Sequence, residues 1–356
     1  MKKKLPHLIC SLVLPSFIYG DISSTTPASK LKESPSYFVD ASFIYWYAKE
    51  DGLNIAESAV VSTAGHTFLS ADGKVLQQSF SYNPGFKVGG GLKQDNWNLL
   101  TEYTWLRGNN KTSKHAPKNH SATSGVGAWN IDDWFLQTTT FGQSPTGSHI
   151  SSKWHLGLDI VDLLAGASIY ENKAVKASAA VGLRTTWIRQ KMDISLTQTL
   201  ASVVNPFLPD QPIKSHTRSR SWGIGPKMGL DLQYLLPVGF RFEGSLATSL
   251  LYTQFSSIKH HENAESTLAL NKKGISTKLG NYSSVRPVLE MKLGTGWHID
   301  FSENKYAFDL KASYDFSIFW GQNVMRKMLD EFWAGTDASA GDLYLQGLTL
   351  SACFKF

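Results

Sequence analysis

The carboxyl-terminal stretch that decides the fold is Asp342-Leu-Tyr-Leu-Gln-Gly-Leu-Thr-Leu-Ser-Ala-Cys-Phe-Lys-Phe356. Steps of two back from the last residue trace a mainly apolar face that includes Phe354, Leu350 and Leu348. The positions between them are more polar: Lys355, Cys353, Ser351, Thr349 and Gly347. Such alternation is typical of a β-strand with one apolar and one polar face. By itself the stretch fits either the last strand of a soluble β-sandwich or a strand of a membrane-spanning barrel, so the rest of the chain must decide.

Nine earlier segments alternate in the same way, which gives ten predicted strands. Their residues are 37–49, 80–92, 97–105, 154–160, 177–190, 224–234, 240–252, 285–301, 306–320 and 342–356. The connections alternate between short links (93–96, 164–173, 236–239, 302–305) and long loops (50–75, 107–152, 191–220, 256–282, 321–341). An even number of strands with alternately short and long connections is the plan of outer-membrane barrels. We therefore predict an all-β fold, a transmembrane antiparallel β-barrel of about ten strands with short periplasmic turns and long extracellular loops.

Two local features qualify this prediction. A further strand pair around residues 129–139 would raise the number of strands to about twelve. Pro84 lies inside a predicted strand and has no N–H to donate, so we expect a β-bulge there.

Aromatic residues at the ends of apolar faces, such as Tyr37, Trp97 and Tyr306, match the interfacial girdles of a membrane barrel.

Composition agrees with a barrel without requiring one. The 356 residues are 42% hydrophobic and 18% charged, with 29 glycines and a mean hydropathy of -0.19. No run of about eighteen apolar residues follows the N-terminus, so no transmembrane helix is expected. These values also suit a large soluble β protein.

The chain divides into three predicted parts. Residues 1–20 resemble a secretory signal peptide, with Lys2, Lys3 and Lys4 before an apolar run. Residues 21–35 are rich in Ser, Thr, Lys and Pro and are predicted to be a disordered periplasmic arm. Residues 36–356 form the barrel. Removal of the signal takes away three lysines and no acid, lowers the net charge from +6 to +3, and leaves Cys353 as the one cysteine, which excludes an intramolecular disulfide.

The ionisable residues of the predicted strands lie on the polar faces, which a barrel turns toward its lumen. A Lys or Arg on the lipid face would cost about 2–4 kcal/mol at the bilayer midplane. Our candidate lumen-lining residues are Lys87, Glu102, Arg184, Lys227, Asp231, Arg241, Glu243, Arg286, Glu290, Lys292, Asp309, Lys311 and Asp315. We also place His155 and Asp159 on the lumen side. The balanced charge fits either a weakly selective aqueous channel or an ion-pair network that fills a narrow barrel.

Several stretches resemble the Legionella-type and chlamydia-type major outer membrane protein family of pore-forming barrels. They are FVDASFIYWYAKEDGL (38–53), PGFKVG (84–89), VGLRTTWIRQ (181–190), GIGPKMGLDLQY (223–234), SLLYTQF (249–255), and residues 294–323, which include GTGWHIDFSENKY and ASYDFSIFWGQN. The resemblance extends in order from residue 38 to residue 356. It implies an outer-membrane location, passive diffusion of solutes and no catalytic residues. Cysteine-rich relatives cross-link through disulfides, which a lone Cys353 cannot sustain.

Signs of other chemistry are weak, and we expect no enzymatic activity, no cofactor and no metal site. Asp132 and Asp133 with His115, His120 or His149 would mimic an acidic protease site, but they fall in a predicted polar loop. His260, His261 and Glu262 would suit a metal, yet adjacent residues point apart on a strand, and we assign them to a solvated loop. No Gly-x-Ser-x-Gly or His-Glu-x-x-His motif occurs.

Two functions from different classes remain open for an exported protein of the bacterial outer membrane. The first is a porin-like channel for passive diffusion of small hydrophilic solutes. The second is a structural or adhesive surface barrel with a closed lumen, whose long loops contact a host or another cell. An outer-membrane hydrolase is a third candidate function, with less support in the sequence.

The expected partners follow from the outer-membrane setting. They are outer-membrane lipid and lipopolysaccharide, and the barrel-assembly machinery, which the strand ending at Phe356 would engage. A homo-oligomer is compatible with the sequence. The small net charge argues against a nucleic-acid partner.

Overall fold

The computed structural model describes residues 35–62, 67–69, 73–94, 96–118, 125–132, 146–197, 212–263, 276–301, 306–327 and 340–356. They belong to one compact unit, Pro35–Phe356. The predicted signal peptide (1–20) and periplasmic arm (21–35) lie outside the described residues, except for Pro35. Among the described residues, no helix is long and apolar enough to cross a membrane.

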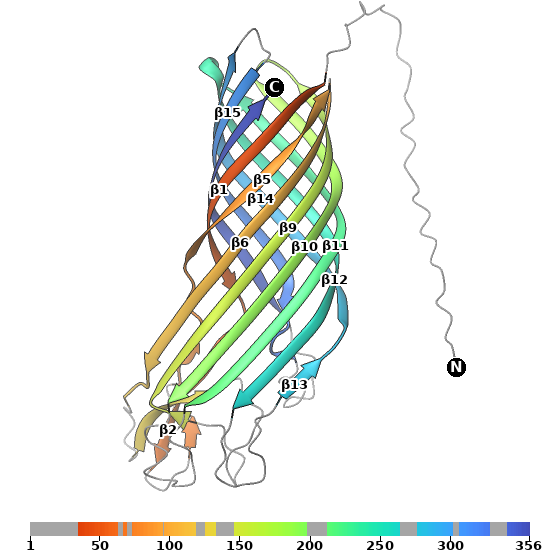
Figure 1. The fold of residues 1–356 in the computed structure, drawn as a ribbon. Coiled ribbons are helices and arrows are strands. Elements are labelled where there is room, and N and C mark those ends of the chain that lie inside the picture. The colour runs from red at the N-terminus through yellow and green to blue at the C-terminus, as the bar shows by residue number, and fades with distance from the viewer. Residues whose placement is uncertain are drawn as a thin grey trace, which may run out of the picture. The chain divides into compact units, whose positions relative to one another are not determined.

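Ten long strands form one closed ring in which each strand is antiparallel to both neighbours (Figure 1). In ring order they are β1 (Ser36–Glu50), β5 (Tyr82–Gln94), β6 (Trp97–His115), β9 (His149–Glu171), β10 (Val175–Thr197), β11 (Ile213–Leu235), β12 (Phe240–Asn263), β14 (Tyr282–Phe301), β15 (Tyr306–Asn323) and β16 (Gly341–Lys355). Neighbours in the ring follow one another along the chain, and β16 closes the ring on β1. The predicted all-β antiparallel barrel is confirmed, and the ring stops at ten strands.

The seam between the first and last strands is paired along its whole length. Its register runs from Phe38↔Lys355 to Glu50↔Leu343, and Tyr37 and Phe356 exchange backbone hydrogen bonds of 2.8 and 2.9 Å. Leu348 is exposed on the outer face and Thr349 is buried on the inner face, as the alternation predicts. Closure is needed because an open edge in hydrocarbon would leave unpaired backbone groups.

The links at the end of the barrel that holds the C-terminus are short (Figure 1). The predicted connection at residues 164–173 is wrong, because β9 continues to Glu171 and only residues 172–174 turn. Asn172 shapes this turn: its Oδ1 accepts hydrogen bonds from the backbone N–H of Ala174 (2.9 Å) and Val175 (2.6 Å). In the next short link, Gly239 has a φ of +77°, and a Cβ there would lie 2.3 Å from the carbonyl oxygen of His298. That turn therefore requires glycine.

At the opposite end the strands run well beyond their predicted limits. The predicted loops at 107–152, 191–220 and 256–282 are partly strand, since β9, β10 and β11 each have 23 residues and β12 has 24. A tilted strand needs about 9–11 residues to cross the hydrocarbon core. The remaining residues continue the same ladder outside the membrane, and we call this part the extracellular extension.

Polarity reverses along each strand where the extension begins. On β10 the outward side chains of Leu183 and Trp187 are exposed apolar residues, whereas the next outward residue, Arg189, is charged. Inward, the charged Arg184 gives way to the buried Ile188 and Met192. Along such a strand the apolar residues face outward in the membrane and inward in the extension. The alternation therefore changes phase within the strand, and for this reason the sequence pattern predicted loops there.

The inner face of the extension is packed with apolar side chains, which we call the apolar lumen cluster. Its barrel members include Ile44, Trp46, Leu106, Trp154, Leu156, Leu158, Ile160, Ile188, Met192, Ile194, Phe319, Leu343 and Leu345. Residues outside the ring join the cluster: Leu53, Ile55, Trp129, Ile131 and Met325. Removal of this apolar surface from water stabilises the extension by about 25 cal/mol per Å² buried.

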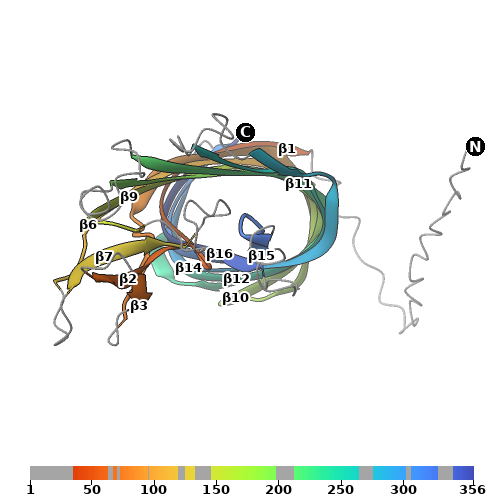
Figure 2. The same cartoon turned by 90° about the horizontal axis from the view of Figure 1, so that it is seen from below.

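A small second sheet lies beside the mouth of the ring (Figure 2). It consists of β2 (Asn54–Ser62), β3 (Thr67–Leu69), β4 (Val75–Gln77), β7 (Gly125–Ile131) and β8 (Thr146–Gly147). The predicted loop at 50–75 is therefore wrong in part. The strand suggested near residues 129–139 is present only as β7, which pairs with β2 and not with the ring, and residues 133–139 lie outside the described part of the chain.

The predicted bulge at Pro84 is wrong. Pro84 pairs with Tyr45 in an unbroken β1–β5 register, and the pairing of β5 with β6 begins one residue later, at Gly85. Pro84 therefore lies at the end of the β5–β6 ladder, where a proline is tolerated more readily than in the middle of a sheet.

Candidate functional site

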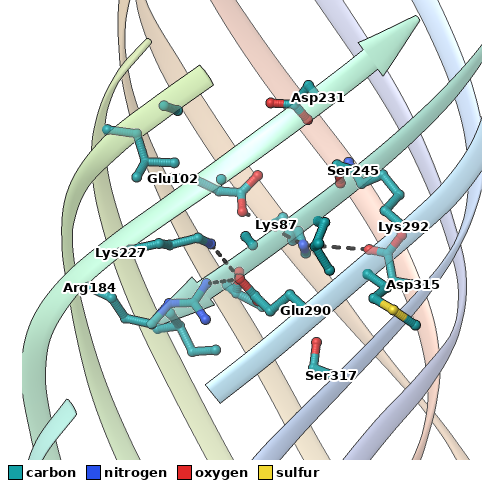
Figure 3. Close-up of a pocket in the computed structure, with 18 of the residues that line it drawn as sticks. Lys87, Glu102, Arg184, Lys227, Asp231, Ser245, Glu290, Lys292, Asp315 and Ser317 are labelled. Atoms are coloured by element: carbon teal, nitrogen blue, oxygen red, sulfur yellow. Dashed lines mark ion pairs between the residues drawn. The ribbon is translucent and has the colours of Figure 1, made fainter. Parts of the chain in front are cut away.

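Seven strands contribute charged side chains to a group of ion pairs in the lumen, and Figure 3 labels all of its members except Asp162. We call this group the ionic network: Lys87 (β5), Glu102 (β6), Asp162 (β9), Arg184 (β10), Lys227 (β11), Glu290 (β14) and Asp315 (β15). Each residue occupies an inward position of its strand. The strand alternation therefore gathers charges that lie far apart in the sequence.

One half of the network is tightly paired. Arg184 holds Asp162 with two parallel hydrogen bonds, Nε to Oδ1 at 2.7 Å and Nη2 to Oδ2 at 2.6 Å. The same Nη2 lies 2.9 Å from Glu290 Oε2. Lys227 Nζ contacts Asp162 at 2.8 Å and Glu290 at 2.6 Å. Arg184 is only 2% exposed, and a buried pair of this kind tolerates the loss of one partner poorly.

The other half of the network is looser. Lys87 Nζ lies 3.7 Å from Glu102 Oε1 and 3.6 Å from Asp315 Oδ2, and 5.0 Å from the ring centroid of Trp46. Asp315 is fixed by hydroxyl donors, since Thr349 Oγ1 donates to its Oδ2 at 2.9 Å. Lys87 is therefore held between two carboxylates and an aromatic face without a short hydrogen bond to either acid.

The network spans the lumen. Arg184 and Glu290 belong to β10 and β14, which β11 and β12 separate in the ring, and Lys87 and Asp315 belong to β5 and β15, which β1 and β16 separate. Side chains of non-adjacent strands can meet only across the interior. The ion pairs therefore narrow the lumen at this level.

Two cavities accompany the network. A cavity of about 180 Å³ is lined by Lys87, Arg184, Lys227, Glu290 and Lys292, among others. A cavity of about 300 Å³ shares Lys87 and extends to Asp40 and Cys353 near the periplasmic end. A single water requires about 15 Å³ on this measure, and both cavities have polar walls. We conclude that the periplasmic half of the lumen can hold several waters.

The thirteen predicted lumen residues all occupy inward positions, but they fall into groups. Lys87, Glu102, Arg184, Lys227, Asp231, Glu290, Lys292 and Asp315 line the smaller cavity, and Glu243 and Lys311 line the larger one. Arg241 and Asp309 form an ion pair of 2.5 Å. Arg286 lies apart on the extracellular side of the network, where its guanidinium is 5.8 Å from the Phe255 ring and 5.9 Å from the Tyr282 ring.

The predicted lumen positions of His155 and Asp159 are wrong. Trp154, Leu156 and Leu158 of β9 belong to the apolar lumen cluster, so His155 and Asp159, at the alternate positions, point outward. Asp159 accepts hydrogen bonds from Arg107 on β6 (2.9 Å) and Arg189 on β10 (2.6 Å) on the outer face. The alternation predicts that Trp154, Leu156 and Leu158 face lipid. In the structure these three residues belong to the apolar lumen cluster.

The prediction also missed two lumen residues. Asp162 falls between the predicted strand, which ends at residue 160, and the predicted connection, which begins at residue 164, although a carboxylate inside the run Ile-Val-Asp-Leu-Leu is a signal for it. Trp46 on β1 is the other: it lies beside Lys87 and donates from Nε1 to Thr349 Oγ1 at 3.1 Å.

A second bridge crosses the lumen within the extension. Gln190 on β10 donates from Nε2 to Glu50 Oε2 on β1 at 2.8 Å, while Oε1 of each side chain has no hydrogen-bond partner among the described residues. Glu50 lies beyond Tyr47, the last outward aromatic residue of β1, and so outside the membrane-spanning part. Burial raises the pKa of Glu50 well above its ordinary range, despite the hydrogen bond from Gln190.

The residues considered for other chemistry have the following contacts where the structure describes them. Asp132 pairs with Arg326 at 2.5 Å, and His115 packs on His149 with ring centroids 4.7 Å apart. Asp133 and His120 lie outside the described residues. The predicted loop at His260 and Glu262 is wrong, because both are buried on β12 and joined at 2.8 Å.

Within the described ranges, no group of three or more His, Cys, Asp or Glu residues is arranged to hold a metal ion.

Solved structures similar to this chain include outer-membrane barrels. The outer membrane protease OmpT from Escherichia coli is 9% identical, with 90% of this chain and 96% of that chain covered and a TM-score of 0.41. Ail, the attachment invasion locus protein of Yersinia pestis, is 9% identical with 91% and 100% covered and a TM-score of 0.27. OprG from Pseudomonas aeruginosa is 11% identical with 89% and 95% covered and a TM-score of 0.26. Likeness at this level carries no argument about function.

The sequence itself gives a clearer relationship. No curated protein matches it. Residues 30–356, however, match the family described as Legionella pneumophila major outer membrane protein precursor. This match includes every strand of the ring, from β1 to β16. The chain therefore belongs to the Legionella major outer membrane protein family and is a β-barrel of the bacterial outer membrane.

Proposed function

We propose that the barrel is a porin-type channel for passive diffusion of small hydrophilic solutes, with the ionic network as its constriction. The observation that carries this proposal is the pair of polar cavities that share Lys87 in their walls, of about 180 and 300 Å³. A lumen with charged and hydrogen-bonding walls suits solutes that keep part of their hydration. Family membership supports the proposal, because it places such a lumen across the outer membrane.

The charges at the constriction favour weak selectivity. The smaller cavity is lined by four cations and four carboxylates: Lys87, Arg184, Lys227, Lys292, Glu102, Asp231, Glu290 and Asp315. A ring of one sign would select strongly for the opposite ion, whereas a balanced ring does not. Removing one carboxylate should therefore shift the channel toward anions.

A specific observation favours the second candidate, a structural barrel with a closed lumen. The extension is filled by the apolar lumen cluster and crossed by the hydrogen bond from Gln190 to Glu50. Hydrophilic solutes would have to displace this packing to reach the outside. The two candidates therefore differ in whether the cluster opens.

Planar-bilayer recording of the refolded protein distinguishes them. We expect discrete conductance steps for the wild type, a shift of the reversal potential toward anion selectivity for Glu290→Gln, and no change for Arg189→Gln, which removes an outward charge of β10. Mobility of unheated samples on gels verifies that each variant is folded. Silent bilayers for all three folded proteins would reject the channel and leave the closed barrel.

Cys353 offers a second test of the aqueous periplasmic half. It lines the larger cavity and is the one cysteine outside the predicted signal peptide. A small charged thiol reagent should modify it in the folded protein. A Cys353→Ser, Leu348→Cys variant, whose thiol faces lipid, should resist the same reagent. Equal resistance of Cys353 would contradict a water-filled cavity.

A further inference from the structure

The outer wall of the extension carries a group of cations, which we call the basic strip: Arg189, Lys191, Arg218, Arg220, Lys259 and Lys278. Arg189 and Lys191 are on β10, Arg218 and Arg220 on β11, Lys259 on β12, and Lys278 on β13 (Ser276–Leu279). These strands are neighbours, and β13 lies against the end of β12 (Figure 1). All six side chains occupy outward positions of their strands.

The strip is a direct cross-strand row and not a scatter of surface charges. Lys191 is opposite Arg218, Arg218 is opposite Lys259, and Lys259 is opposite Lys278. Arg189 is likewise opposite Arg220. Directly opposed side chains have Cβ atoms about 5 Å apart, and like charges in this arrangement destabilise a sheet. The row therefore favours an anionic ligand that would relieve the repulsion.

Two cations of the strip, Arg189 and Lys191, form ion pairs with carboxylates of the protein. Asp159 pairs with Arg107 at 2.9 Å and Arg189 at 2.6 Å, and Asp193 pairs with Lys191 and with His216 at 2.7 Å. Although burial opposes its ionisation, the Lys191 and His216 contacts hold the pKa of Asp193 below its ordinary value. Among the residues that the structure describes, no carboxylate forms an ion pair with Arg218, Arg220, Lys259 or Lys278.

The strip begins where the lipid-facing band ends. Trp187 on β10 and Trp222 on β11 are opposite each other and exposed, and Arg189 and Arg220 are the next outward residues toward the extension. Two residues along a tilted strand correspond to a rise of about 5 Å. Tryptophan side chains settle at the membrane–water interface. The first cations of the strip therefore lie at headgroup height, and the others rise from there along the tilted wall.

We propose that the basic strip binds the phosphate groups of lipopolysaccharide in the outer leaflet. Guanidinium groups match phosphate oxygens with paired hydrogen bonds, and lysine adds compact point charges. The strip lies on the lateral wall and begins directly above the lipid-facing band, rather than at the mouth of the barrel, which favours a membrane headgroup over a soluble anion. This site is independent of whether the lumen conducts.

Binding of deep-rough lipopolysaccharide to the refolded chain in detergent with EDTA tests the proposal. The strip variant is Arg218→Gln, Lys259→Gln, Lys278→Gln. The matched control, Lys49→Gln, Lys114→Gln, Lys173→Gln, loses the same charge from exposed lysines elsewhere. Native mass spectrometry should show affinity about tenfold or more weaker for the strip variant and unchanged for the control. Dephosphorylated lipopolysaccharide should bind the wild type as weakly as intact lipopolysaccharide binds the strip variant.

Three outcomes overturn the assignment. The first is an equal loss of lipopolysaccharide affinity in the strip variant and the control variant. The second is that dephosphorylated lipopolysaccharide binds the wild type as tightly as intact lipopolysaccharide does. The third is that the strip substitutions weaken binding of a sulfated polysaccharide such as heparin but not binding of lipopolysaccharide. A second measurement covers a variant that refolds poorly. In lipopolysaccharide-free micelles Arg218→Gln alone should unfold at a urea concentration equal to or above that of the wild type, and added lipopolysaccharide should stabilise the wild type more than this variant. A lower midpoint for the variant, or equal stabilisation by lipopolysaccharide, would contradict the repulsive row.

Discussion

The membrane-spanning part of the barrel and its extracellular extension are built from the same strands with opposite polarity. In the membrane-spanning part of β10, Leu183 points outward and is 51% exposed, while Arg184 points inward and is 2% exposed. In the extension of the same strand, Arg189 points outward and Ile188 is buried inside. The backbone ladder is continuous through both parts. The comparison teaches that the medium outside the wall, lipid or water, decides which face is apolar.

The two parts are consequently held together in different ways. Inside the membrane band, ion pairs and hydrogen bonds fill the lumen, because the apolar residues are needed against lipid. In the extension, the apolar lumen cluster forms a core of the kind found in small soluble barrels. Substitutions of the same chemical kind should therefore have unequal effects in the two parts.

The largest effect is expected from Arg184→Ala. It leaves Asp162 and Glu290 buried with Lys227 as their remaining shared partner, and we expect a loss of about 3–5 kcal/mol in the free energy of unfolding. The control is Arg189→Ala on the same strand. Its side chain is 55% exposed, and its ion pair with Asp159 should contribute within about 1 kcal/mol, since Arg107 still pairs with Asp159. Urea unfolding in lipid vesicles measures both. If both substitutions lowered the free energy of unfolding by similar amounts, the ionic network would not stabilise the barrel more than an ion pair on the outer wall.

Leu158→Ala tests the core of the extension. Leu158 is fully buried in the apolar lumen cluster, so the cavity left behind should cost about 2–5 kcal/mol. On the same strand, Leu163 faces lipid and is 45% exposed, and Leu163→Ala should cost less than about 1 kcal/mol. The same unfolding assay compares them. A larger effect at Leu163 would show that the extension is not packed as a core.

Met228→Arg tests the lipid side. Met228 lies between Tyr234 and Trp222 on the outer face of β11 and is 57% exposed, so an arginine there should cost about 2–4 kcal/mol. Asn109→Arg places the same charge on the outer face of the extension, where water solvates it, and should change stability by less than about 0.5 kcal/mol. If both arginines were equally tolerated, the assigned boundary of the membrane band would be wrong.

The smallest effect concerns the buried carboxyl of the extension. Because the pKa of Glu50 is raised in the folded state, the folded protein binds more protons than the unfolded chain between the two pKa values. Stability should therefore be greatest below the unfolded pKa of about 4.3 and fall as pH rises toward the folded pKa. Glu50→Gln should remove this decline and be the more stable protein at pH 7, while the two should converge near pH 4. Parallel pH profiles would contradict a raised pKa of Glu50 in the folded protein.

The sequence by itself determined the barrel and much of its lumen. Period-two alternation located ten strands, and the alternating link lengths predicted antiparallel neighbours, because both features depend only on local spacing. It also placed residues such as Arg184, Lys227 and Glu290 on inward faces, since a charge on the lipid side is excluded by its solvation cost.

Only the tertiary structure decided at which residue of each strand charged side chains stop facing inward and begin to face outward. Whether Trp154 and Asp159 face in or out depends on the height at which the wall leaves the membrane, and that height follows from strand tilt and register, which no local pattern encodes. The same holds for the pairing of Arg184 with Asp162 and Glu290, and for the alignment of Lys191, Arg218 and Lys259 on the outer wall. These contacts join strands that are distant in sequence, so they exist only once the ring has closed.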